Sequence, residues 1–245
     1  MSALLETRGL TKRFGGFTAN DDVNFSIDGG EIRGIIGPNG AGKTTLTNLI
    51  TGVEPPTSGA VIFDGRPITG LAPAEIARRG LVRSFQVARV FGAMSLTENL
   101  LTAFLAHRSG FSTRADGISR ARELLDLTKL ARLADEPARV LSGGQRVLLQ
   151  AAAGFMCPDL KLYLLDEPFA GVNPVIKDII LDLIAHERRT RAMTFLVVSH
   201  EMEIMRRLCD KITVMVEGKI FFEGPLDEVA KNPAVVSAYL GRAFA

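Results

Sequence analysis

The sequence predicts an α/β fold with a phosphate-binding core, a small antiparallel β part near the N-terminus and an inserted α-helical part. Three observations lead to this prediction. A glycine-rich turn lies between an apolar stretch and a helical stretch at residues 32–50. Short apolar runs alternate with helical patterns along most of the 245 residues, which is typical of sheets connected by helices. Residues 96–133 show helical periodicity without a strand signal, which predicts a helical insert.

The first strands are expected to form a small antiparallel sheet. Leu4–Leu10 and Val23–Ile27 are apolar or alternate in polarity, as strands with one buried face do. The residues Lys12-Arg13-Phe14-Gly15 are expected in the first turn. A third strand is predicted at Ala60–Phe63, and the Asp64-Gly65 pair after it is a hairpin turn signal.

A phosphate-binding turn is the strongest local signal. The residues that fit the pattern G-x-x-x-x-G-K-[ST], with the threonine after it, are Gly37, Pro38, Asn39, Gly40, Ala41, Gly42, Lys43, Thr44 and Thr45. They lie between a predicted strand, Ile32–Ile36, and a predicted helix that starts at Leu46 and ends before Gly52. In this context backbone N–H groups point at a phosphate, and the helix N-terminus adds partial positive charge. Lys43 is expected to reach the β- and γ-phosphates, and the hydroxyl of Thr44 to bind Mg²⁺.

The helical insert follows a short helix at Pro73–Arg79 and a strand at Leu81–Phe85 that ends at Gln86. Within the insert, a loop is expected at Ser109–Asp116. An apolar helix then opens at Ser142-Gly143-Gly144-Gln145. Ser-x-x-Gln is a capping box, and a glycine-bare helix N-terminus is also an anion site. The two interpretations are compatible.

Two adjacent carboxylates, Asp166 and Glu167, end the predicted buried strand Leu162–Leu165. At the C-terminal end of a parallel strand such groups face the ligand crevice. One carboxylate can hold Mg²⁺ through water, and the other can accept a proton from an attacking water. The alternative is a strand that ends in solvated acids. The elements predicted after this strand are a helix at Val175–Ala185 preceded by Asn173-Pro174, a strand at Phe195–Val198, a helix at Glu201–Leu208, a hairpin of Ile212–Val216 and Lys219–Phe222, and helices at Leu226–Lys231 and Ala234–Leu240.

Composition narrows the function classes. The formal net charge of +2 gives no basic field of the kind that strong nucleic-acid binding needs, so no nucleic-acid partner is expected. Cys157 and Cys209 make neither a disulfide framework nor a metal cluster, and we expect both to be buried small apolar residues. No signal peptide is expected from the N-terminal residues, and no apolar run approaches the 18 residues of a membrane span. A cytosolic, reducing setting is the expectation.

Taken in order, five features resemble the ATP-binding cassette (ABC) ATPases: Gly37–Thr45, Gln86, Leu141-Ser142-Gly143-Gly144-Gln145, Leu162–Glu167 and His200. The resemblance covers essentially the whole chain, and the Leu-Ser-Gly-Gly-Gln stretch separates this family from other phosphate-binding-loop proteins. It implies a single domain with a P-loop NTPase (RecA-like) core. The core and the β part would take approximately residues 1–86 and 146–245, and the helical part approximately residues 87–145.

The resemblance also implies roles for individual residues, with ATP and Mg²⁺ as ligands. Phe14 would stack on adenine, with Phe17 as a second candidate, and Lys43, Thr44 and Thr45 would bind the phosphates and the metal. Gln86 would contact the metal and the attacking water, and Asp166 would be the acidic partner of the metal. Glu167 would be the general base and His200 would hold the γ-phosphate. Ser142, Gly143, Gly144 and Gln145 would clamp the ATP of a second subunit, and the loop Ala170, Gly171, Val172 and Asn173 would couple the two sites.

The local pattern is most similar to the branched-chain and hydrophobic amino acid uptake group, whose members import such amino acids, urea or amides. The stretches that carry this similarity are Arg83–Gln86, Arg89–Phe91, Glu98–Leu100, Ala170–Pro174 and Ala238–Gly241. Lipopolysaccharide-export ATPases share much of this pattern. After Gln145 the chain departs from it, because Leu148 and Ala153 stand where most relatives carry arginines.

The partners that the resemblance implies are a second ATPase subunit, identical or not, membrane-spanning permease subunits and, indirectly, a solute-binding protein. The chain would then be peripheral, on the cytoplasmic face of the inner membrane. Phe85–Leu96 would receive a permease helix, with Val90, Phe91, Met94 and Leu96 as exposed apolar candidates; ordinary core packing is the alternative. Two other classes fit less well. Non-transport cassettes have a long coiled-coil insertion or two cassettes in one chain, and a kinase with the same turn would not need Leu141–Gln145.

Overall fold

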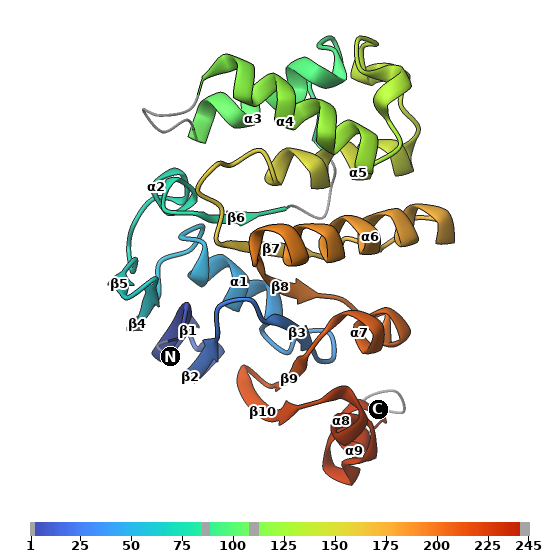
Figure 1. Ribbon diagram of the computed structural model, residues 1–245. Helices are drawn as coiled ribbons and strands as arrows, with labels where there is room; N and C mark the ends of the chain where they lie inside the picture. Colours follow the sequence, from blue (N-terminus) through green and yellow to red (C-terminus); the bar gives the residue numbers. More distant parts are fainter. Residues whose placement is uncertain (1–2, 85–88, 108–112, 241–245) are drawn as a thin grey trace. The chain divides into compact units, whose positions relative to one another are not determined.

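The computed structural model describes residues 3–84, 89–107 and 113–240, without the side chains of residues 107 and 238–240 (Figure 1). Backbone contacts group the chain into two compact units, Met1–Ile76 with Thr194–Ala245, and Ala77–Met193. Within the described ranges, no helix combines the length and the apolar character that crossing a membrane requires.

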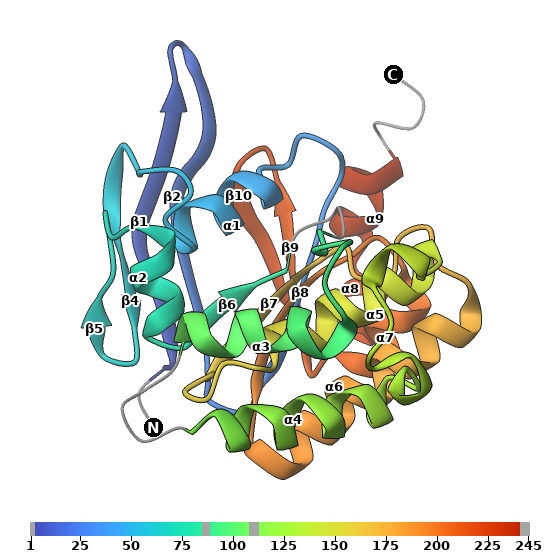
Figure 2. The same cartoon turned by 90° about the horizontal axis from the view of Figure 1, so that it is seen from above.

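The first unit contains a four-stranded antiparallel sheet with the strand order β2-β1-β4-β5. Its strands are β1 (Leu5–Phe14), β2 (Phe17–Ile27), β4 (Ser58–Phe63) and β5 (Arg66–Pro67). The expected turn at Asp64-Gly65 is confirmed, since both residues have positive φ and join β4 to β5. The expected turn at Lys12–Gly15 is wrong, because Lys12 to Phe14 continue β1 and pair with β2. The two strands form the long hairpin of Figure 2.

The first unit also contains the strands that carry the phosphate-binding turn. They are β3 (Ile32–Ile36), β8 (Thr194–Val198), β9 (Lys211–Val216) and β10 (Lys219–Gly224). β3 pairs in parallel with β8 and β9, and β10 closes an antiparallel hairpin with β9. Every residue of β3 and β8 is buried, as expected for the inner strands of a parallel sheet.

Helices of the first unit follow these strands. They are α1 (Lys43–Ile50), α7 (Met202–Leu208), α8 (Leu226–Lys231) and α9 (Pro233–Leu240). α1 starts three residues before the predicted Leu46, because the left-handed Gly42 (φ 93°) already serves as its N-cap. At its other end Gly52 takes φ 70°, which confirms the predicted stop. The short helix α2 (Pro73–Arg78) leads to the second unit along the chain.

The second unit combines two parallel strands with the helical insert. Its strands are β6 (Leu81–Arg83) and β7 (Leu162–Asp166), its helices α3 (Leu96–His107), α4 (Arg114–Leu127), α5 (Gly143–Gly154) and α6 (Pro174–Arg191), and two 3₁₀ turns lie at Ala131–Leu133 and Ala138–Val140. α3 packs against α4 and α5, and α5 packs against α6. β6 is shorter than expected, and the predicted strand end at Phe85 and Gln86 lies outside the described residues.

Two helix boundaries in this unit differ from the prediction. α4 begins at Arg114, within the expected loop Ser109–Asp116, because Thr113 and Asp116 form a capping box. α6 continues past Ala185 to Arg191 because Glu187 is fully buried. Its carboxylate accepts hydrogen bonds from Arg120 Nη2 (2.6 Å) on α4 and from Arg191 Nη1 (3.3 Å). A charged residue thus takes the place of the apolar side chain that a helical pattern requires.

Candidate nucleotide-binding site

Close backbone approach explains the glycines of the phosphate-binding turn. A Cβ atom on Gly37 would lie 2.3 Å from the carbonyl oxygen of Met215, and one on Gly42 would lie 2.4 Å from that of Ala19. Gly37 and Gly42 also have positive φ, of 157° and 93°. A side chain at either position would therefore displace neighbouring backbone of the first unit.

The turn is open where an anion would bind. A Cβ on Gly40 would meet no atom within 4 Å. Gly42, the N-cap of α1, supplies no side-chain hydrogen bond to the first turn of the helix. Since the first N–H groups of a helix need acceptors and carry partial positive charge, a phosphate fits this end of α1.

The ammonium group of Lys43 lies over the turn. Its Nζ donates to the carbonyl oxygens of Gly37 (2.7 Å) and Pro38 (3.0 Å). The residue is buried, whereas the neighbouring Thr44 is exposed and Thr45 half-buried. A buried ammonium bound to backbone carbonyls holds the turn in its curled form and places a cation beside its N–H groups.

His200 lies at the same edge of the sheet as this turn. β8 pairs in parallel with β3, so that Val198 lies opposite Ile35, and the two strands end side by side. His200 is exposed two residues after β8, and Gly37 follows β3 directly. The first unit thus brings His200 and the turn together.

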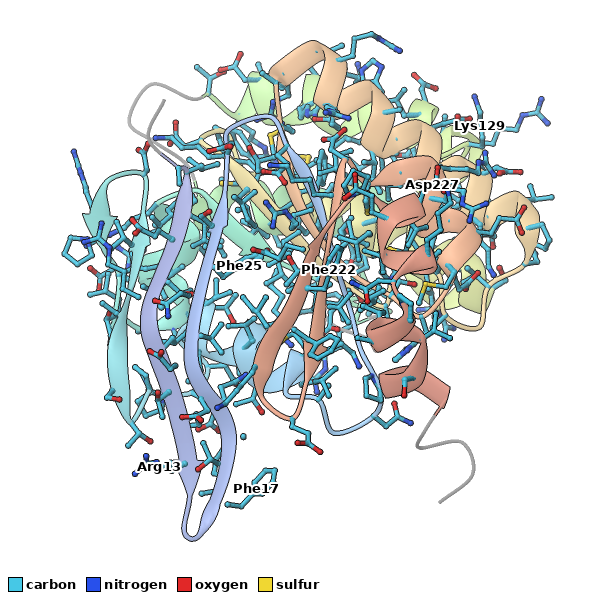
Figure 3. All side chains as sticks on the ribbon, turned by 90° about the horizontal axis from the view of Figure 1, so that it is seen from below. Arg13, Phe17, Phe25, Lys129, Phe222 and Asp227 are labelled. Carbon is cyan, nitrogen blue, oxygen red and sulfur yellow. The ribbon has the colours of Figure 1, made fainter. Side chains whose placement is uncertain are left out.

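Both candidate adenine contacts lie at the tip of the β1–β2 hairpin. Phe14 and Phe17 are opposite each other in the register, with exposed fractions of 48% and 63%. Lys12 Nζ lies 4.8 Å from the centre of the Phe14 ring. Figure 3 shows Phe17 near the end of the hairpin with its ring directed away from the ribbon.

The acidic pair lies in the second unit at the end of β7. Asp166 is the last residue of the strand, and its backbone N–H donates to Ser84 Oγ (3.2 Å). Its Oδ2 accepts a hydrogen bond from Arg83 Nη2 at 2.7 Å. Glu167 takes a left-handed φ of 50°, which is uncommon for a residue with a long side chain and typical of functional loops.

The predicted capping box at the start of α5 is confirmed. Gln145 N–H donates to Ser142 Oγ (3.3 Å), and Ser142 N–H donates to Gln145 Oε1 (2.9 Å). A Cβ on Gly143 would meet nothing within 4 Å, whereas one on Gly144 would lie 3.0 Å from Ile176 Cγ1 of α6. Of the two residues at the expected departure after Gln145, Leu148 is buried and Ala153 is half-buried. Leu148 is therefore part of the core of this unit.

The expected coupling loop connects the acidic pair to α6. Ala170 N–H donates to the carbonyl oxygen of Glu167 (3.2 Å), and Gly171 has φ 69°. Asn173 caps α6, since its Oδ1 accepts a hydrogen bond from Ile176 N–H (3.0 Å). Val172 is half-buried between them. The loop is thus anchored at both ends within the second unit.

The segment expected to receive a permease helix is partly exposed. Phe91 and Met94 are exposed, but Leu96 is fully buried, so its expected exposure is wrong. Leu96 opens α3, and its side chain belongs to the core. Asn99 organises the segment, because its amide donates to the carbonyl oxygens of Phe91, Met94 and Ser95. From the sequence, Asn99 indicates only a similarity to the amino acid uptake group.

The donor set is suited to Mg²⁺ held partly by phosphate. Thr44 and Asp166 offer oxygen atoms only, and Gln86 lies outside the described residues. Over the part of the chain that the structure describes, no three His, Cys, Asp or Glu side chains gather as a metal-binding group. Mg²⁺ commonly uses one or two protein oxygens together with substrate phosphates and water, so each of these residues is of a type that can bind the metal.

Comparison with known proteins identifies the family. A family model described as ABC transporter matches residues 20–170. The chain belongs to the ABC transporter family. A second model, described as branched-chain amino acid ATP-binding cassette transporter, matches residues 219–245 of this cassette. The ABC ATPase expectation from the sequence is thereby confirmed, and the cassette is an ATP-hydrolysing enzyme.

Relatives align with the cassette over nearly its whole length. The probable branched-chain amino acid transport ATP-binding protein LivG of Archaeoglobus fulgidus is 38% identical, covering 97% of this chain and 95% of the relative. The high-affinity branched-chain amino acid transport ATP-binding protein BraF of Pseudomonas aeruginosa is 37% identical, covering 98% of both chains. LivG of Escherichia coli K12 is 35% identical with the same coverage.

Solved structures confirm the predicted fold class. The ADP conformation of MJ1267, an ATP-binding cassette of an ABC transporter, matches with a TM-score of 0.85 and 34% identity, over 98% of this chain and all of that chain. A dimeric post-hydrolysis state of the cassette MJ0796, bound to ADP and phosphate, matches with a TM-score of 0.80 and 26% identity, over 91% of this chain and 98% of that one.

Proposed function

We propose that this chain is one of two ATPase subunits of an importer of branched-chain amino acids, bound to membrane-spanning permease subunits at the cytoplasmic face of the membrane. The names of the relatives and the C-terminal family match support this substrate class over lipopolysaccharide export. The same proposal includes approximate boundaries. The core with the β part takes residues 1–86 and 146–245, and the helical part takes residues 87–145.

The observation that carries the proposal is the phosphate-binding turn of the first unit. Neighbouring backbone leaves no room for a Cβ at Gly37 or Gly42, whereas Gly40 faces open space. The helix α1 begins without a side-chain cap. With Lys43 lying over it, this turn offers a triphosphate several N–H donors, a helix N-terminus and a cation. His200 at the same sheet edge is suited to the γ-phosphate.

A second copy of the chain, or a related one, would complete the site. The turn covers one side of the γ-phosphate, and the other side would face water. The capped helix start at Ser142 and Gly143, exposed on the second unit, is suited to close that side in a partner subunit. Excluding bulk water strengthens each electrostatic contact with the phosphate.

Hydrolysis then depends on positioning and charge. Glu167 orients a water and accepts its proton as the water oxygen bonds to the γ-phosphorus, and the bond from that phosphorus to the β–γ bridging oxygen breaks. Lys43 and His200 stabilise the charge on the transferred group. Thr44, Gln86 and Asp166 would hold Mg²⁺, which would neutralise phosphate charge. ADP and phosphate repel each other in the closed interface, which favours its opening.

The dimer can be tested with Glu167→Gln, which leaves nucleotide binding intact but removes the base. With saturating ATP and Mg²⁺ we expect this variant to elute as a dimer in size-exclusion chromatography with light scattering, and as a monomer without ATP. Lys43→Ala is the matched control, and it is expected to stay monomeric because it lacks the cation beside the turn.

A monomeric Glu167→Gln variant under saturating ATP would contradict the composite site. The substrate class is tested separately. Membrane subunits co-purified with the native protein and reconstituted in vesicles should drive ATP-dependent uptake of leucine. Recovery of the chain only with nucleic acid, or transport of a glycolipid instead, would contradict the importer.

A further inference from the structure

We propose that Arg83 is a positioning residue that holds the carboxylate of Asp166 in the orientation in which it accepts Mg²⁺ together with ATP. The inference rests on the proposed metal role of Asp166. It adds a residue that lies outside the phosphate turn, the acidic pair and the Leu141–Gln145 stretch. Its basis is a buried contact between the ends of two parallel strands.

The contact is short and well shielded. Arg83 Nη2 lies 2.7 Å from Asp166 Oδ2, and the two side chains are only 8% and 12% exposed. β6 and β7 pair in parallel, with Arg83 opposite Leu164, so both side chains project at the end of the same strand pair. Charged hydrogen bonds of this length are stronger than neutral ones, and more so away from water.

Ser84, the residue directly after β6, holds the end of β7 at further points. Ser84 N–H donates to the carbonyl oxygen of Leu164 (2.9 Å), and Asp166 N–H donates to Ser84 Oγ (3.2 Å). Ser84 is itself buried. Backbone and side chain of Asp166 are therefore both fixed by two consecutive residues, Arg83 at the end of β6 and Ser84 directly after it, which leaves the carboxylate little rotational freedom.

The orientation matters for a metal held through water. Arg83 engages Oδ2, so Oδ1 is the oxygen that a metal-bound water would use. The positive charge of Arg83 also offsets that of the carboxylate, and removing this charge would by itself strengthen the attraction for Mg²⁺. A fall in Mg²⁺ affinity after replacement of Arg83 therefore reports the lost orientation of the carboxylate. Residues that orient a metal ligand commonly change metal affinity about 10- to 100-fold when replaced.

The test measures how much Mg²⁺ strengthens nucleotide binding, without using ATPase activity. The purified protein is titrated with the fluorescent analogue mant-ATP, once with Mg²⁺ and once with EDTA, and the ratio of the two dissociation constants is taken as the magnesium gain. For Arg83→Gln we expect the gain to fall about 10-fold or more, while the dissociation constant in EDTA stays within about twofold.

Arg83→Lys keeps the charge but not the fork geometry of the guanidinium, and it should lose part of the gain. It also serves if Arg83→Gln does not fold. Arg120→Gln is the matched control, because Arg120 forms a similar short contact, 2.6 Å to the buried Glu187, in the same unit. It should keep the full gain. In the Asp166→Asn background, adding Arg83→Gln should change the gain less than about twofold, because both act through one carboxylate.

Three outcomes would overturn the inference: an unchanged or larger gain in both Arg83 variants, equal losses with Mg²⁺ and with EDTA, or an equal loss of gain in Arg120→Gln. The failure of the underlying metal assignment looks different. In that case Asp166→Asn alone would keep the wild-type gain. If Asp166→Asn loses the gain and the Arg83 variants keep it, Asp166 remains the metal partner and only the positioning role is rejected.

Discussion

The two cysteines show how burial sets the chemistry of a single side chain. Cys157, after α5, is buried, and burial raises the pKa of its thiol to about 11. Cys209, at the end of α7, is half-buried, and desolvation followed by the charge of Asp210 raises its pKa to about 12. The expected burial is therefore complete for Cys157 and partial for Cys209. Both thiols are free in the structure.

We expect both thiols to react slowly with iodoacetamide in the native state. Since the thiolate is the nucleophile, a pKa raised from 9.0 to about 11 for Cys157 and to about 12 for Cys209 should slow alkylation at pH 7.5, by on the order of 100-fold and 1000-fold respectively, relative to the unfolded chain. The stability that folding gains from keeping these thiols protonated is fully present below about pH 9. It is lost as the pH rises through the folded pKa values of about 11 and 12. Mass spectrometry in buffer and in urea measures the rates, and fast native labelling would contradict the burial.

At the level of helices and strands, α5 shows how one element carries two different glycine requirements. Gly143 opens the helix, and a Cβ there would meet nothing within 4 Å. Gly154 ends it, and a Cβ there would lie 2.1 Å from the Tyr163 ring carbon Cζ. That ring is fully buried and packs edge-on against Phe155, with 4.9 Å between the ring centres. The absence of a side chain at Gly154 therefore allows the end of α5 to pack closely against Tyr163 of β7.

We predict that Gly154→Ala lowers the free energy of unfolding by about 1–3 kcal/mol, because the buried ring of Tyr163 must move. Gly143→Ala is the control in the same helix, and it should be neutral or stabilising by up to about 1 kcal/mol. Urea denaturation of both variants without nucleotide measures the difference. Equal stabilities would show that Tyr163 moves aside at little cost.

At the scale of the whole molecule, large apolar side chains lie exposed on the surface where the sequence predicts a permease contact. Phe91, with 61% of its surface exposed, and Met94 lie in the loop that Asn99 organises. The hydrogen bonds of Asn99 keep this loop ordered although its large apolar side chains face solvent. A permease helix, as proposed above, would bury them.

We expect Phe91→Asp to weaken retention of the membrane subunits at least about 10-fold, because burying an unpaired charge in an apolar contact is costly. ATP-dependent dimerisation should persist, since the change is outside the proposed nucleotide site. Leu105→Asp, at a residue with 55% exposure in α3, is the control and should retain the membrane subunits. Co-purification from membranes compares the two. Loss in both variants would point to general destabilisation instead.

Several features could be predicted because their causes lie within a few residues of chain. The positive φ of Gly40 and Gly42 in the phosphate turn, the Ser142–Gln145 capping box and the Asp64-Gly65 hairpin each satisfy local backbone geometry. Patterns failed where a charge takes an apolar position. The helical pattern suggested that α6 ends at Ala185, but buried Glu187, paired with Arg120 from α4, carries the helix on to Arg191.

The chemistry of the candidate site divides in the same way. Its residue types could be named from the linear pattern, because a phosphate cradle and a strand-end carboxylate are encoded in short segments. The contacts that surround these residues could not be predicted from the sequence. Arg83 and Asp166 are separated by 83 positions, and their contact exists only because β6 and β7 pair in one register. Leu96 likewise has the same apolar character as its exposed neighbour Met94, yet it is buried because α3 packs on α4 and α5. Contacts between distant segments depend on the packing of whole elements, which no local pattern records.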